Sequence, residues 1–104
     1  MNIVDGEHCE ALCAQFQYQW IATLRDTLKK HGIPAAAARE ICGDFSFDLS
    51  MIFDQGEIKS GRDTYRPVVA FTDDADEPTM IYQDGGVEFH EYAFGTTAEV
   101  FKSG

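Results

Sequence analysis

The chain has 104 residues, 44% of them hydrophobic, and 18 Asp and Glu against 8 Lys and Arg give a net charge of −10. This length predicts one domain over residues 1–104, with a core large enough to fold without disulfides or metals. The strong negative charge repels nucleic acids and anionic membranes and attracts basic partners. We therefore expect neither nucleic-acid nor membrane binding, and no apolar run approaches the length of a bilayer span.

The three cysteines are predicted to be reduced. Cys9 and Cys13 fall four residues apart, where two helical side chains are usually too distant for an unstrained disulfide, and Cys42 stands alone. The first ten residues show no secretory signal pattern. Together these features predict a cytoplasmic protein.

The segment from Glu7 to His31 predicts an amphipathic helix that Gly32 terminates. Its apolar residues recur at steps of three and four, which places them on one face: Cys9, Leu12, Cys13, Phe16, Trp20, Leu24 and Leu28.

Pro34 and the alanines after it predict the start of a second helix. Residues 43–54 fit two patterns, because polar and apolar residues alternate as in a strand while Ile41, Phe45 and Leu49 fit one helical face. We favour one long helix that ends near Asp54, with Gly56 as its C-cap.

The rest of the chain predicts two hairpins and a short closing helix. Residues 57–59 and 64–72 flank the turn Ser-Gly-Arg-Asp, with Pro67 confining the second strand to an edge or bulge. After a solvated loop over 73–78, residues 79–83 and 87–94 flank Asp-Gly-Gly. Thr96 and Glu99 have capping-box spacing.

The predicted fold is therefore an α+β domain. Two N-terminal helices pack on an antiparallel sheet of three to four strands, arranged as two hairpins, and a short C-terminal helix follows.

No metal or cofactor site is expected. His8, Cys9 and Cys13 lack the paired spacing of zinc ligands, and the acids at 73–77 lack the spacing of a calcium loop. Asp84 would repel a phosphate from the glycines that follow it.

Catalysis has one weak candidate, His90. On a strand, His90 would share a face with Glu88 and Tyr92, and such a set can transfer protons. No nucleophile motif accompanies it, so we expect a protein that is not an enzyme.

The acidic residues are unevenly distributed, since residues 67–101 hold eight acids and no Lys or Arg. Our leading hypothesis is a small cytoplasmic interaction module, in its most concrete form an inhibitor or immunity-type protein, whose acidic C-terminal half docks on a basic partner. Carboxylates would steer association and aromatic residues would anchor it. The candidate partner-binding residues are Asp73, Asp74, Asp76, Glu77, Asp84, Glu88 and Glu91, with Tyr82, Phe89 and Tyr92 as anchors.

Two alternatives remain open. One is a small enzyme or small-molecule-binding protein with a pocket centred on His90, and the other is a homodimer without a ligand.

Overall fold

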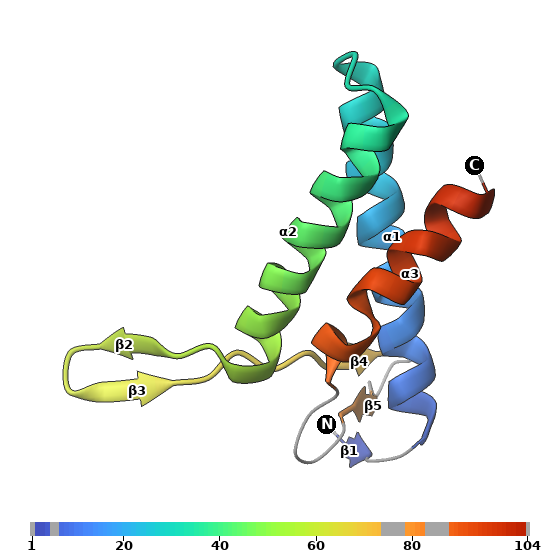
Figure 1. Ribbon diagram of the computed structural model, residues 1–104. Helices are drawn as coiled ribbons and strands as arrows, with labels where there is room; N and C mark the ends of the chain where they lie inside the picture. Colours follow the sequence, from blue (N-terminus) through green and yellow to red (C-terminus); the bar gives the residue numbers. More distant parts are fainter. Residues whose placement is uncertain (1, 5–6, 74–78, 83–87, 104) are drawn as a thin grey trace.

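The computed structural model describes residues 2–4, 7–73, 79–82 and 88–103, and within them the chain forms an α+β domain dominated by helices (Figure 1). This confirms the predicted class, with two N-terminal helices and a C-terminal one. In chain order the elements are β1 (Asn2–Val4), α1 (Glu7–Lys30), α2 (Ala35–Gln55), β2 (Ile58–Ser60), β3 (Asp63–Tyr65), β4 (Phe71–Thr72), β5 (Thr79–Ile81) and α3 (Phe89–Ser103).

Helix α1 ends as the sequence predicts. Gly32 adopts a φ of +78°, and its N–H donates to the carbonyl of Lys29 while the N–H of Ile33 donates to the carbonyl of Leu28. This pair of hydrogen bonds is the Schellman motif, which satisfies carbonyls at the end of a helix.

The ambiguous segment 43–54 is helical, which confirms the favoured alternative. It is part of α2, whose buried positions Ala38, Cys42, Ser46 and Ser50 recur every four residues. Gly43 lies where α3 approaches most closely, because a Cβ there would sit 3.1 Å from the ring of Phe94.

The first hairpin is confirmed. Strands β2 and β3 pair antiparallel, with Ile58 opposite Tyr65 and Ser60 opposite Asp63. Gly61 in the turn has a φ of +64°, as the first central residue of a type II′ turn does. Figure 1 shows this hairpin extending away from the helices.

The second sheet differs from the expected hairpin. Strand β5 pairs antiparallel with β4 and, on its other side, parallel with β1, which the sequence analysis did not anticipate. The predicted strand over 64–72 divides into β3 and β4, with Pro67, which has no N–H for a ladder, in the intervening segment.

The predictions of a strand over 87–94 and of a helix beginning near Thr96 are wrong where the structure describes them. Helix α3 already begins at Phe89. Phe89, Ala93, Thr97 and Val100 are buried at steps of four, four and three, which is helical spacing. Thr96 therefore lies inside the helix and does not begin it. Thr97 also lies inside the helix, where its hydroxyl donates to the carbonyl of Ala93 at 2.7 Å.

The core lies where the three helices meet. One cluster surrounds Cys9, Cys13 and Phe89 and includes Phe71 and Ile81 of the three-stranded sheet, so the helices pack on that sheet as predicted. A second cluster surrounds Ile21, Cys42 and Val100. Among the described residues, no helix combines the length and the apolar character that crossing a bilayer requires.

Candidate functional site

The junction between α2 and α3 is built around Asp54, whose side chain is only 4% exposed. Its carboxylate accepts hydrogen bonds from the backbone N–H groups of Phe89 at 3.1 Å and His90 at 2.9 Å. These are the first N–H groups of α3, which have no partner inside their own helix. Asp54 therefore caps α3 from another helix, and its negative charge faces the positive end of the helix dipole.

His90 forms the third bond of this junction, with Nδ1 at 2.5 Å from the second carboxylate oxygen of Asp54. This hydrogen bond is the main reason that the pKa of His90 lies above its usual value, and Glu88 and Glu91 add to it. The imidazole stands edge-on to Phe47 and is 23% exposed. A histidine fixed in this way can accept and release a proton at Nε2.

The predicted grouping of Glu88, His90 and Tyr92 on one face is wrong, because this segment is helical. From Phe89 onward each residue of α3 turns by about 100° about the helix axis, so His90 and Tyr92 point in different directions. Tyr92 instead faces α1.

A buried glutamine connects all three helices. The amide nitrogen of Gln17 on α1 donates to the carbonyl of Phe89 at 2.9 Å and to Oγ of Ser50 at 3.4 Å. Its Oε1 accepts a hydrogen bond from the hydroxyl of Thr96. These bonds satisfy a polar side chain that is 1% exposed and fix the start of α3 against α1.

Tyr92 lies near three carboxylates, and we call these four residues the Tyr92 acidic cluster: Glu10 of α1, Glu88 just before α3, and Glu91 and Tyr92 at the start of α3. The hydroxyl of Tyr92 donates to Glu10 at 3.3 Å. The Glu10 carboxylate is also the largest cause of a raised pKa at Tyr92, with smaller contributions from Glu91 and Glu88. Glu88 raises the pKa of Glu91 through a hydrogen bond and through like charge. All four residues are exposed.

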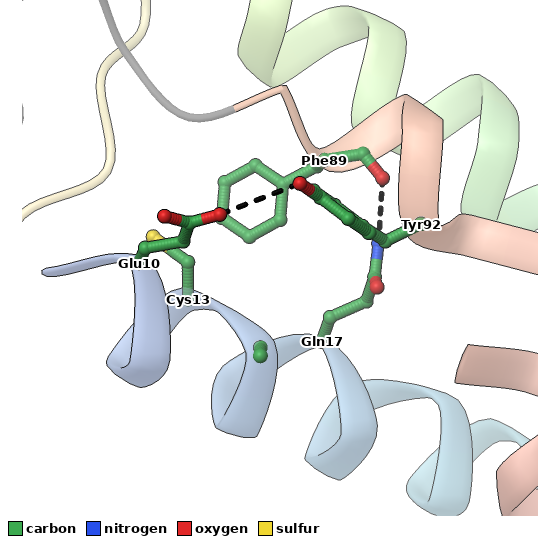
Figure 2. Close-up of a pocket in the computed structure, with 6 residues that line it drawn as sticks. Glu10, Cys13, Gln17, Phe89 and Tyr92 are labelled. Atoms are coloured by element: carbon green, nitrogen blue, oxygen red, sulfur yellow. Dashed lines mark hydrogen bonds between the residues drawn. The ribbon is translucent and has the colours of Figure 1, made fainter. Parts of the chain in front are cut away.

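A shallow pocket lies beside this cluster, between α1 and α3. It encloses about 340 Å³ of space, open solvent included, and is lined by Glu10, Cys13, Ala14, Gln17, Phe89 and Tyr92. Figure 2 shows the phenol of Tyr92 reaching toward Glu10 past the ring of Phe89, while the side chain of Gln17 rises from α1 to the backbone carbonyl of Phe89. The pocket thus combines an apolar floor with a carboxylate at its rim.

The other predicted partner-binding residues divide into three groups. Asp73 is exposed next to β4, where its carboxylate accepts from the N–H of Thr79. Tyr82 is half-buried and Phe89 is buried in the core. Asp74, Asp76, Glu77 and Asp84 lie outside the described residues.

Sequence reasoning missed Glu10, Gln17 and Asp54 as site residues. Glu10 and Tyr92 are 82 residues apart, and only the packing of α3 on α1 brings them together. The sequence did hold a clue to the role of Asp54. A carboxylate in the last turn of a helix interacts unfavourably with the negative end of that helix's dipole. A carboxylate in that position is therefore expected to interact with a different helix or strand.

The cysteines lie in the core. Burial, with the neighbouring Cys9 as the next cause, raises the pKa of the Cys13 thiol to about 12, and burial also raises the pKa of Cys42. All three are free and buried. Within the described part of the chain, no three His, Cys, Asp or Glu side chains converge as metal ligands would.

Comparison of the chain with protein-family models, with curated proteins and with solved structures finds no match. The functional assignment therefore depends on the geometry above.

Proposed function

We propose that this protein is a cytoplasmic interaction module that binds a basic protein partner through the Tyr92 acidic cluster. The observation that carries the proposal is an exposed tyrosine that donates a hydrogen bond to one exposed carboxylate and lies near two others. Aromatic residues supply much of the binding energy in protein interfaces, and surrounding charge supplies steering and specificity.

The electrostatics of the cluster favour a cationic ligand. Glu88 raises the pKa of Glu91, first through a hydrogen bond and also through the repulsion of its like charge. An Arg or Lys side chain placed between them relieves this repulsion. The pocket beside Tyr92 offers an apolar surface to the aliphatic part of such a side chain and Glu10 to its charge.

The position of the pocket counts against the alternative of a small-molecule site centred on His90. His90 is absent from the lining of this pocket, and both its Nδ1 and its backbone N–H are engaged by Asp54. The geometry therefore favours a role for His90 in anchoring α3.

The test compares two variants that remove the same charge from different places. Glu88→Gln with Glu91→Gln changes the cluster, and Asp44→Asn with Asp48→Asn changes two exposed acids of α2. Each variant and the unchanged protein serve as bait in host lysate at low and moderate salt. Any basic protein that is retained is then titrated against all three by calorimetry.

We expect the cluster variant to bind the retained protein at least about tenfold more weakly and with a smaller salt dependence. The α2 variant should bind within about threefold of the unchanged protein. Equal weakening by both variants would show that net charge alone drives retention and would refute the cluster as the site.

The finer assignment as an inhibitor or immunity-type protein makes a separate prediction. If the retained partner is a basic enzyme that acts on a phosphate-containing substrate, the carboxylates of the cluster take the place of substrate phosphates. We expect the unchanged protein to inhibit that enzyme and the cluster variant to inhibit it at least about tenfold less.

A further inference from the structure

The pocket beside Tyr92 is formed by two segments of the chain that contain acids and no Lys or Arg. Its lining comes from α1 and from the first turn of α3. Residues 1–24 hold three acids and residues 67–101 hold eight, and neither range contains a Lys or Arg. The charges that raise the pKa of Tyr92 are those of Glu10, Glu91 and Glu88. A ligand that reaches the pocket therefore meets negative charge.

Groups that can carry a positive charge near this part of the molecule lie outside the pocket. Arg66 reaches the end of α2, where it donates to the carbonyl of Asp54 at 3.2 Å. His90 bonds to the Asp54 carboxylate, so that a protonated imidazole and its partner are neutral as a pair. His8 precedes Glu10 by two residues, about 200° around the axis of α1, and so points to nearly the opposite side.

The pocket itself offers apolar surface and one carboxylate. Cys13 is buried, and because burial and Cys9 raise its pKa to about 12, its thiol is neutral. Gln17 uses both amide N–H groups inside the protein, on the carbonyl of Phe89 and on Oγ of Ser50. Glu10 is the charged residue of the lining. The ligand that matches this surface has an apolar stem and a cationic end, as Lys and Arg side chains do.

Tyr92 distinguishes between these two side chains. Its side chain is 50% exposed, and its hydroxyl lies 3.3 Å from Glu10, a long distance for an O–H···O hydrogen bond. An aromatic ring and a carboxylate thus lie side by side at the rim. A guanidinium is planar and weakly hydrated, so it can stack on the ring and donate to the carboxylate at once. An ammonium is compact and strongly hydrated, so it loses more in an apolar pocket.

We propose that the anchor residue of the partner is an arginine, whose guanidinium stacks on Tyr92 and donates to Glu10 while its methylene groups lie against the apolar floor of the pocket. This inference rests on the proposed function, because it names the side chain that the Tyr92 acidic cluster binds. Glu88 and Glu91 attract any cation, whereas the ring of Tyr92 selects arginine over lysine.

The experiment uses two short peptides of equal length and equal charge. They differ only at one central position, which is Arg in one and Lys in the other, and both carry lysines at their ends. Each is titrated by NMR into the isotopically labelled full chain at moderate salt. We expect the arginine peptide to bind at least about fivefold more tightly, with its largest shifts at Glu10 and Tyr92.

Three variants test whether Tyr92 causes the preference. Tyr92→Leu removes the ring and should bring the two affinities to within about twofold of each other, whereas Tyr92→Phe keeps the ring and should keep the preference. The matched control is Tyr65→Leu, because Tyr65 on the hairpin is exposed to a similar extent, 56%. It should leave the ratio of the two affinities unchanged. Since both tyrosines are exposed, circular dichroism should show all three variants folded.

The outcomes separate this inference from the proposed function. Equal affinity for the two peptides, lost for both in the Glu88→Gln, Glu91→Gln variant, would support the cluster as a basic-partner site and overturn the preference for arginine. A preference that persists in Tyr92→Leu would also overturn it, because the ring would not be its cause. If neither peptide binds, the proposed function and this inference are both refuted.

Discussion

Asp54 is the residue on which the candidate site depends most. It lies in the last turn of α2, yet its carboxylate receives three hydrogen bonds from the first two residues of α3. Glu88 and Glu91 flank this junction, and Tyr92 directly follows Glu91. Asp54 therefore positions the Tyr92 acidic cluster without belonging to it.

We expect Asp54→Ala to lower the free energy of unfolding by about 2 to 4 kcal/mol, because it leaves buried N–H groups of α3 without a partner. Urea unfolding at pH 6 measures the loss. Asp48→Ala, an exposed position on the same helix, should change stability by less than about 0.5 kcal/mol. Similar losses in both variants would contradict the capping role.

His90 makes stability depend on pH. Its pKa in the folded protein lies above the ordinary value of 6.5, chiefly because of its hydrogen bond to Asp54. The stabilisation is therefore complete below pH 6.5 and is lost as the pH rises through the raised value. Replacing Asp54 with Asn should return the pKa of His90 toward 6.5, as an NMR titration of the imidazole would show. A pKa that stays raised in this variant would mean that another group causes the shift.

At the scale of elements, the sequence predicts what local patterns determine. Gly32, Gly56 and the Ser-Gly-Arg-Asp turn mark the ends of α1 and α2 and the first hairpin, and the structure confirms each. The start of α3 could not be predicted from its neighbours, because its cap is Asp54, 35 residues away. The alternation of polar and apolar residues before Phe94 suggested a strand where α3 forms. The burial of these residues depends on contacts with α1 and α2, which the local pattern does not contain.

Two glycines offer a test of how α2 ends. A Cβ on Gly56 would lie 2.4 Å from the carbonyl oxygen of Ile52, so the backbone has to move in Gly56→Ala. We expect a loss of about 1 to 3 kcal/mol. Gly95, inside α3, has open space around it, and Gly95→Ala should instead gain up to about 1 kcal/mol from helix propensity. Thermal unfolding of both variants gives the signs, and a stabilised Gly56→Ala would contradict this account of the C-cap.

At the scale of the whole molecule, the Tyr92 acidic cluster and the β2–β3 hairpin lie in different places. The Tyr92 acidic cluster lies where α3 begins against α1, and the hairpin extends from the end of α2 (Figure 1). Composition alone revealed the excess of acid in the C-terminal third. It did not reveal that Glu10 of the first helix joins Glu88 and Glu91, because that grouping depends on how the helices pack.

Binding of a basic partner at the Tyr92 acidic cluster is tested most directly by an NMR titration of the isotopically labelled full chain with a short arginine-rich peptide at moderate salt. We predict saturable shifts that are largest at Glu10, Glu88, Glu91 and Tyr92, and their loss in the Glu88→Gln, Glu91→Gln variant. Shifts that are spread equally over exposed acids elsewhere, including Asp44 and Asp48, would show a general attraction to negative charge and would contradict a specific site at Tyr92.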